Sequence, residues 1–145
     1  MDTIFTKEQI KEIIPHREPM LMIDEIVEME AGKSIIAKFY LDPKYDFFRG
    51  HFPEEPVMPG VLTVESMAQT ADVLLLLMPE FAGKIPLFLG IDNVRFRKKV
   101  RPGDTIEIQV KLSEVREERG IAQCDAMVFN GGELSATGTV KLAMR

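Results

Sequence analysis

Residues 50–69 read GHFPEEPVMPGVLTVESMAQ, and the rest of the chain is organised around this stretch. It starts beside one of the chain's 2 histidines, passes through prolines at 53, 56 and 59, and ends in an apolar segment. Each proline fixes φ and cannot donate a backbone hydrogen bond, which predicts a stiff loop. From Val61 to Met78 the chain is rich in Leu, Met, Ala and Val without another proline or glycine, which predicts one long helix.

The start of this helix has no side chain that could cap it. Gly60 occupies the expected N-cap position and offers no oxygen to the first amide groups. Unpaired amides at a helix N-terminus attract negative charge, including the charge that develops on a carbonyl oxygen during a reaction. The sequence therefore predicts that a ligand carbonyl could bind at Gly60.

The predicted helix carries polar residues on one face. Glu65, Gln69 and Asp72 follow the i, i+4, i+7 spacing, while most other positions are apolar, as expected for a buried helix. A carboxylate there and the imidazole of His51 on the preceding loop form the pair that acid–base catalysis requires. Taken alone, each residue also has a structural interpretation, with His51 stabilising a turn and Glu65 balancing the helix dipole.

Several short motifs, in a fixed order along the chain, together resemble one enzyme family. They are Pro15-His16-Arg17 with Pro19 and Asp24, Phe47-Phe48, Gly50-His51-Phe52-Pro53, Pro56-Val57-Met58-Pro59-Gly60-Val61, Glu65 with Met67-Ala68-Gln69, Ile91-Asp92, and Phe96 ahead of Pro102-Gly103-Asp104. In these positions the chain resembles the FabZ-type 3-hydroxyacyl-[acyl-carrier-protein] dehydratases of bacterial fatty acid synthesis. The resemblance spans most of the chain.

The resemblance implies a hot-dog fold, in which an antiparallel sheet wraps around one long central helix. It implies that His51 and Glu65 are catalytic, that the Gly60 amide binds the thioester carbonyl, and that no cofactor is needed. In this family two sheets pair edge to edge, and the histidine and carboxylate of one site come from different protomers. We therefore expect a homodimer, and three such dimers form a hexamer in relatives.

Two further groups of residues are candidates for substrate contacts. Met58, Leu87 and Phe88 could line a tunnel for the acyl chain, although core packing explains them equally well. The densest basic cluster in the chain is a candidate docking surface for acyl carrier protein, a small acidic partner. It consists of Arg95, Arg97, Lys98, Lys99 and Arg101. A solvated strand face is the alternative interpretation.

Length and composition limit the function classes. The 145 residues predict a single domain, residues 1–145, and the net charge of −5 argues against nucleic acid as a partner. With 1 cysteine and 2 histidines, the chain has no internal disulfide and offers little for a metal site. Residues 1–14 lack the apolar core of a signal peptide, and residues 73–78 are too few to span a membrane. We expect a cytoplasmic, soluble protein.

The secondary-structure pattern predicts an α+β arrangement. Thr6 and Gln9 form a capping box for a short helix that ends before Pro15. The glycine pair after Asn130 predicts a hairpin. Strands are expected over residues 21–29, 33–41, 87–100, 105–115, 120–129 and 134–144.

Departures from the family pattern leave alternatives open. Glu18, Arg49 and Glu54-Glu55 are unusual, and two carboxylates beside the His51 loop could repel an acidic carrier. His16 is interpreted as a structural histidine bonded to the backbone. A hot-dog acyl thioesterase and a non-catalytic acyl-thioester-binding protein remain the competing functions.

Overall fold

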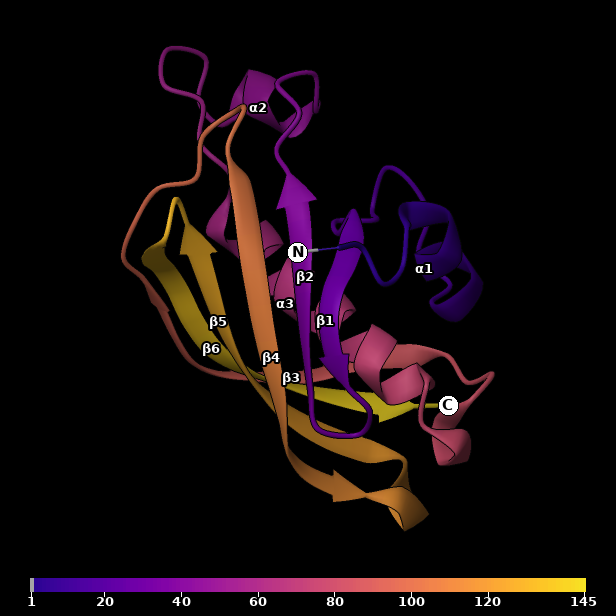
Figure 1. The fold of residues 1–145 in the computed structure, drawn as a ribbon. Helices are drawn as coiled ribbons and strands as arrows, with labels where there is room; N and C mark the ends of the chain where they lie inside the picture. The colour runs from indigo at the N-terminus through magenta and orange to yellow at the C-terminus, as the bar shows by residue number, and fades with distance from the viewer. Residues whose placement is uncertain (1) are drawn as a thin grey trace.

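The computed structural model describes residues 2–145 as one antiparallel sheet with a long helix against it (Figure 1). The helices and strands follow in chain order. They are α1 (Lys7–Ile13), β1 (Glu25–Glu30), β2 (Ser34–Tyr40), α2 (Phe47–Gly50), α3 (Gly60–Leu76), η1 (Pro79–Phe81), β3 (Pro86–Phe96), β4 (Thr105–Arg116), η2 (Glu117–Arg119), β5 (Ile121–Asn130) and β6 (Glu133–Met144).

The sheet has 6 strands in the order β1-β2-β4-β5-β6-β3, and all neighbouring strands run antiparallel. Side chains alternate between the two faces, so Ala122, Cys124, Ala126 and Val128 of β5 are buried while the residues between them are more accessible. The predicted α+β arrangement is confirmed. The order leaves β1 and β3 as the two edges of the sheet.

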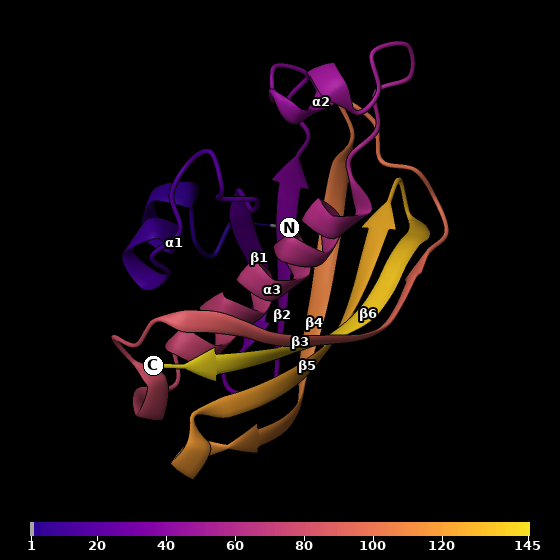
Figure 2. The ribbon, with the colours of Figure 1, turned by 180° about the vertical axis from the view of Figure 1, so that it is seen from behind.

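Helix α3 lies across the sheet and is buried over most of its length (Figure 2). It approaches β6 closely at Gly138, where a Cβ atom would lie 3.4 Å from Met67 Sδ and 3.0 Å from Val94 Cγ2. The contact with Met67 is an ordinary van der Waals distance, whereas the contact with Val94 of β3 is tight. Gly138 therefore lets β3, β6 and α3 pack closely at this point.

The helix starts one residue earlier than predicted and ends two residues earlier. Pro59 is the N-cap, Gly60 is the first helical residue, and Leu77 is the C-cap. Leu77 and Met78 separate the end of the helix from Pro79, which begins a short 3₁₀ turn. Pro59 has no side-chain cap either, so the first amides still lack a side-chain acceptor.

The N-terminal helix α1 is capped at both ends. Thr6 and Gln9 form the predicted capping box. At the other end, the Arg17 guanidinium donates hydrogen bonds to the carbonyl oxygens of Lys11 at 2.8 Å and Ile14 at 3.0 Å. Arg17 therefore fixes the start of the loop that leads from α1 to β1.

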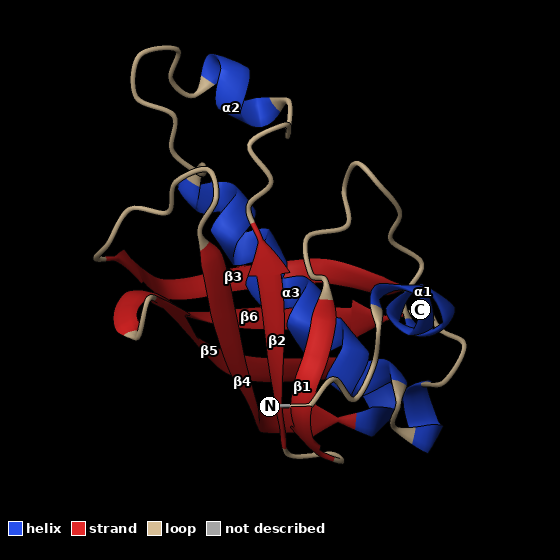
Figure 3. Ribbon diagram, turned by 45° about the horizontal axis from the view of Figure 1, so that its top comes forward, coloured by secondary structure: helices blue, strands red, loops and turns tan. Residues whose placement is uncertain are grey.

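Two segments differ from the expected strands. The first strand begins at Glu25, because the backbone of Met22 is hydrogen-bonded to Gln69 and Ser66 of α3 rather than to a neighbouring strand. The third strand ends at Phe96 instead of Val100. Residues 47–50 form the short helix α2, which projects with the following loop beyond one end of the sheet (Figure 3).

The predicted hairpin after Asn130 is confirmed. Asn130 pairs with Glu133, so Gly131 and Gly132 are the two turn residues, with φ of 61° and 81°. Two positive φ angles are typical of the type I′ turn, which favours glycine. None of the helices in residues 2–145 is long and apolar enough to cross a membrane.

Candidate active site

A cavity of about 490 Å³ lies at the N-terminus of α3. Its lining includes Met58 and Gly60 from the proline-rich loop and helix start, and Phe96 from the end of β3. Leu62 and Thr63 donate their amides to the Pro59 carbonyl oxygen, whereas the Gly60 amide has no acceptor within residues 2–145. A free amide at a helix N-terminus, facing a hollow, is suited to bind a carbonyl oxygen.

His51 is held in one orientation by the loop it belongs to. Its Nδ1 atom lies 3.0 Å from the carbonyl oxygen of Val57, and its ring stacks on Phe52 with centroids 4.2 Å apart. Because a carbonyl oxygen only accepts hydrogen bonds, the proton must sit on Nδ1. The other nitrogen, Nε2, then carries a lone pair and can accept a proton. The His51–Phe52 peptide bond is cis.

Glu65 lies on the second turn of α3, and its side chain is 16% exposed. Burial raises the pKa of its carboxyl group, while a hydrogen bond from Gln69 acts in the opposite direction. That bond joins Gln69 Nε2 to Glu65 Oε2 at 2.7 Å. A raised pKa favours the protonated form of the carboxyl group, and this form can act as an acid.

Gln69 is fully buried and uses its whole amide group. Its oxygen accepts the Met22 amide at 2.7 Å, and its nitrogen donates to the Met20 carbonyl oxygen at 2.8 Å as well as to Glu65. Ser66 adds a hydrogen bond to the Met22 carbonyl oxygen at 3.0 Å. These bonds tie the loop before β1 to the face of α3 that carries Glu65.

No hydrogen bond or ion pair joins His51 to Glu65 within residues 2–145. Glu65 is instead close to His16, whose Nε2 lies 3.8 Å from Glu65 Oε2 and 3.8 Å from Asp72 Oδ2. His16 Nδ1 is buried without a hydrogen-bond partner in residues 2–145. The interpretation of His16 as bonded to the backbone is therefore wrong. Its ring faces the two carboxyl groups because the loop before β1 is bound to α3.

Comparisons with known proteins identify the family. The model of the FabA-like domain family matches residues 14–139. The protein named 3-hydroxyacyl-[acyl-carrier-protein] dehydratase FabZ from Symbiobacterium thermophilum is 45% identical over 92% of this chain and 92% of its own length. The protein of the same name from Staphylococcus saprophyticus is 44% identical over 100% of this chain and 99% of its own. The chain belongs to the FabZ-type dehydratase family.

Solved structures show that this FabZ-type chain has the hot-dog fold. The dehydratase heterocomplex ApeI:P from Xenorhabdus doucetiae matches with a TM-score of 0.80 at 17% identity, covering 94% of this chain and 90% of that one. A mutant thioesterase from Pseudomonas aeruginosa matches with a TM-score of 0.71 at 15% identity, covering 97% and 94%. At these identities the likeness concerns the fold alone.

The three tunnel candidates of this FabZ-type chain are not together in one protomer. Met58 is buried and lines the cavity at the helix N-terminus, with its sulfur 3.5 Å from Thr63 Oγ1. Leu87 and Phe88 lie on the edge strand β3, are 51% and 40% exposed, and do not line this cavity. Their role as tunnel residues stays a prediction.

The basic cluster borders the same cavity, which Arg97, Lys98 and Lys99 help to line. Acidic partners neutralise part of it. Lys99 Nζ lies 2.7 Å from Glu55 Oε1, and Lys98 Nζ lies 3.4 Å from Glu133 Oε2. Glu55 was expected to repel an acidic carrier, but its carboxylate forms an ion pair with Lys99. Arg95, Arg97 and Arg101 form no ion pair within residues 2–145.

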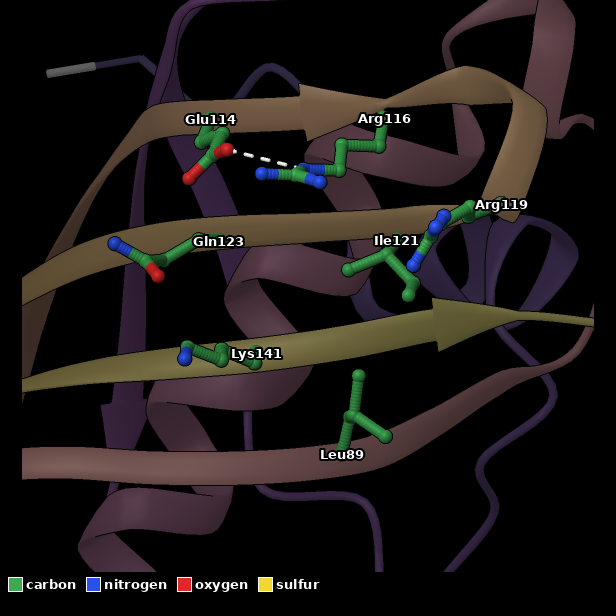
Figure 4. Close-up of a pocket in the computed structure, with 7 residues that line it drawn as sticks. All are labelled: Leu89, Glu114, Arg116, Arg119, Ile121, Gln123 and Lys141. Carbon is green, nitrogen blue, oxygen red and sulfur yellow. Dashed lines mark hydrogen bonds and ion pairs between the residues drawn. The ribbon is translucent and has the colours of Figure 1, made fainter.

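A second hollow, of about 250 Å³, lies on the face of the sheet turned away from α3 (Figure 4). Arg116, Arg119 and Lys141 contribute positive charge, but Arg116 Nε lies 3.1 Å from Glu114 Oε1 and Lys141 Nζ 3.5 Å from Asp92 Oδ2. None of the predicted site residues lines this hollow. Arg119 in this hollow is therefore a suitable charge-matched control for the arginines beside the candidate active site.

The sequence did not predict that His16 lies beside Glu65 and Asp72. The helical spacing did place Asp72 on the face of Glu65 and Gln69, and the structure confirms this. Nothing in the spacing connects His16, which lies far from α3 along the chain. The link is made by the Gln69 and Ser66 hydrogen bonds to residues 20 and 22, which only the folded chain reveals.

Proposed function

We propose that this protein removes water from (3R)-3-hydroxyacyl thioesters of acyl carrier protein and forms trans-2-enoyl thioesters, with His51 as base and Glu65 as acid. The observation that carries the proposal is the match to relatives that bear the dehydratase name, 45% identical over 92% of the chain. Three tasks have to be performed. They are removal of a proton from C2, polarisation of the thioester carbonyl, and protonation of the departing hydroxyl group.

His51 suits the first task. Its Nδ1–H donates to the Val57 carbonyl oxygen, so the Nε2 lone pair is free to accept the C2 proton. The same hydrogen bond stabilises the imidazolium that forms, because the Val57 carbonyl dipole faces the positive ring.

The Gly60 amide suits the second task. When a proton leaves C2, negative charge develops on the thioester oxygen, and a fixed donor at that place lowers the barrier. The Gly60 amide lacks an acceptor within residues 2–145 and stands at the positive end of a 17-residue helix. It is therefore oriented before the substrate arrives.

Glu65 suits the third task. The hydroxyl group leaves as water only if it receives a proton, and the raised pKa of Glu65 favours the protonated carboxyl group that can supply it. Gln69 holds Oε2 in place through a 2.7 Å bond. The proton passes from the Glu65 carboxyl to the hydroxyl oxygen, and water departs.

His51 and Glu65 come together only if a second protomer completes the site. Strand β3 is an open edge of the sheet. It exposes a row of large apolar side chains, which an edge-to-edge pairing with a second β3 would cover. These are Leu87, Phe88, Leu89, Ile91 and Phe96. Each site of this homodimer would use His51 of one protomer and Glu65 of the other.

Product analysis tests the reaction. Purified protein is incubated with 3-hydroxyacyl-acyl carrier protein, and the mixture is analysed by mass spectrometry. A loss of one water from the acyl carrier protein species supports the dehydratase. Release of free carrier thiol would indicate a thioesterase instead, and an unchanged substrate would indicate an acyl-binding protein.

Subunit complementation tests the shared site. His51→Ala and Glu65→Gln variants are each expected to lose about 10²–10⁴-fold in kcat. When equal amounts of the two are unfolded and refolded together, half of the dimers are mixed and one of their two sites is intact. About a quarter of wild-type activity should then return if sites form between protomers. No return would show that both residues must belong to one chain.

A further inference from the structure

The segment that leads from β3 to β4 has no regular secondary structure, yet hydrogen bonds hold it against the β5–β6 hairpin (Figure 2). Residues 97–101 of this connection carry most of the basic cluster, and we call them the basic segment. Two side chains of the hairpin bind it, and both are buried, with Asn130 6% and Ser135 2% exposed. Buried polar side chains of this kind fix the position of the chain that they bind.

Asn130 binds the chain on both sides of Arg101. Its Nδ2 atom donates to the Lys99 carbonyl oxygen at 3.1 Å and to Asp104 Oδ2 at 2.9 Å. The same Asp104 oxygen accepts the Arg101 amide at 2.8 Å. One side-chain amide therefore determines the course of the chain from the end of the basic segment to the start of β4.

Ser135 binds the other end of the basic segment. Its hydroxyl donates to the Lys98 carbonyl oxygen at 2.8 Å, and its carbonyl oxygen accepts the amides of Arg97 at 2.7 Å and Lys98 at 3.2 Å. Between these two ends, the Val100 carbonyl oxygen accepts the Met58 amide at 2.7 Å. Every residue of the basic segment thus has a backbone group in a hydrogen bond, so the segment is ordered although it is neither helix nor strand.

The lysines and arginines of the basic cluster are used differently. Lys98 Nζ donates to the Asn130 carbonyl oxygen at 3.1 Å and lies 3.4 Å from Glu133 Oε2, so Lys98 adds a further contact to the hairpin. Lys99 is also paired with a carboxylate. The cluster residues without an ion pair in residues 2–145 are Arg95, Arg97 and Arg101. The charges that remain for a partner are therefore those of the arginines.

We propose that Asn130 is a positioning residue for the docking of acyl carrier protein, because it fixes the basic segment before the acidic carrier arrives. A surface that is ordered in advance loses less conformational entropy on binding than a mobile one. Asn130 is buried and acts through the backbone of the segment, so it need not contact the carrier itself. The inference rests on the proposed function, in which an acidic carrier brings the substrate.

The candidate active site should keep its shape without Asn130. Neither Asn130 nor Asp104 lines the cavity at the start of α3. The bond between Met58 and Val100 joins the basic segment to the proline-rich loop and does not involve Asn130. Loss of Asn130 should therefore affect a substrate that is attached to the carrier more than a short soluble thioester.

Steady-state kinetics with the two kinds of substrate test this difference. In Asn130→Ala, KM for 3-hydroxyacyl-acyl carrier protein should rise about 3- to 10-fold, with kcat and the KM for a short 3-hydroxyacyl thioester little changed. The rise should be smaller at high salt, which screens the arginines in both proteins. An unchanged KM for the carrier substrate, or an equal rise for both substrates, would overturn the proposal.

Two further variants separate positioning from a loss of stability. Val128→Ala removes buried methyl groups from the same strand and should lower the unfolding midpoint without raising KM for the carrier substrate. Ser135→Ala removes only the bond to the Lys98 carbonyl oxygen and should raise that KM in the same direction as Asn130→Ala. If Val128→Ala raises KM as much as these two variants do, stability alone explains the effect.

Exchanging the two polar partners provides a rescue. Asn130→Asp places two carboxylates side by side and should raise KM for the carrier substrate. Adding Asp104→Asn restores a donor between the two side chains and the original net charge, while the new amide oxygen can still accept the Arg101 amide. KM of the double variant should return toward the unaltered value. A double variant that is no better than Asn130→Asp would contradict the proposal.

Two measurements on the full-length protein do not need the reaction. The Arg101 amide should exchange its hydrogen faster in Asn130→Ala, because its acceptor Asp104 is no longer held, and equal exchange would overturn the proposal. Fluorescence anisotropy of labelled acyl carrier protein should show weaker binding to this variant than to the unaltered protein. No binding to the unaltered protein would also overturn the proposal, whereas failure of the dehydration assay alone would overturn only the proposed function.

Discussion

The ring of Phe96 lies directly against the backbone of Gly60. A Cβ atom on Gly60 would be only 2.7 Å from Phe96 Cζ and 3.0 Å from Cε1. No real pair of carbon atoms is that close without displacement. The first residue of α3 must therefore be glycine for the end of β3 and the start of the helix to keep their present places.

The first prediction follows from this contact. Gly60→Ala should push against the Phe96 ring and shift the first turn of α3, which displaces the amide proposed to bind the thioester carbonyl. Loss of one such donor costs about 10²–10³-fold in kcat. The measurement is steady-state kinetics with the acyl-carrier substrate, accompanied by thermal unfolding to confirm that the variant is folded.

Two further variants separate this clash from a general effect of alanine. Gly50→Ala adds a Cβ with nothing within 4 Å and should leave the unfolding midpoint unchanged. Phe96→Leu in the Gly60→Ala background removes the ring and should restore part of the lost kcat. If the double variant is no better than Gly60→Ala alone, the steric explanation is wrong.

The second prediction concerns Gln69. Gln69→Leu leaves the Met22 amide and the Met20 carbonyl oxygen without their partner, which should cost about 1–3 kcal/mol of stability for each group. It also removes the hydrogen bond that lowers the pKa of Glu65. The alkaline limb of kcat/KM should therefore move to higher pH. A shift to lower pH would contradict this reasoning.

The third prediction concerns docking of the carrier. Arg97 borders the cavity and forms no ion pair within residues 2–145, so Arg97→Glu should raise KM for the carrier-bound substrate several-fold and weaken its salt dependence. KM for a short soluble thioester should change little, because such a substrate lacks the acidic carrier. Arg119→Glu, in the hollow on the other face of the sheet, is the matched charge reversal. Equal effects of the two variants would show that only net charge matters.

The sequence predicted the scaffold well because its patterns are local. The capping box at Thr6, the Gly131-Gly132 turn and the apolar run of α3 each depend on a few neighbouring residues. The motifs around His51 and Glu65 also led to the family. The predicted ends of the long helix were less accurate. Neither Pro59 nor Gly60 has a side chain that can cap a helix, so the sequence did not show which of them is the N-cap.

What the sequence could not predict depends on contacts between distant segments. His16 reaches Glu65 because Gln69 hydrogen-bonds to residues 20 and 22, and no periodicity encodes that meeting. The ion pair of Glu55 with Lys99 joins residues 44 positions apart. Local pattern also could not show how His51 and Glu65 are arranged, and no hydrogen bond or ion pair joins them within residues 2–145.

The last prediction concerns the buried carboxyl group of Asp72 and the pH dependence of protein stability. Because the pKa of Asp72 is raised in the folded protein, its folded form prefers to keep the proton. Its contribution to the free energy of unfolding is therefore favourable below the pKa of the unfolded chain, about 3.9, and is lost as pH rises toward the folded value. Replacing Asp72 by Asn removes this loss.

The difference in stability between Asp72→Asn and the unaltered protein should accordingly grow in favour of the variant from pH 4 upward. The slope is at most about 1.4 kcal/mol per pH unit, and urea unfolding at several pH values measures it. Asp125→Asn, which removes an exposed carboxyl group on β5, should show no such growth. His16 contributes a slope of the opposite sign below its unfolded pKa in both proteins, since its folded pKa is lowered. A difference that stays constant with pH would mean that Asp72 is ionised in the folded protein at little cost.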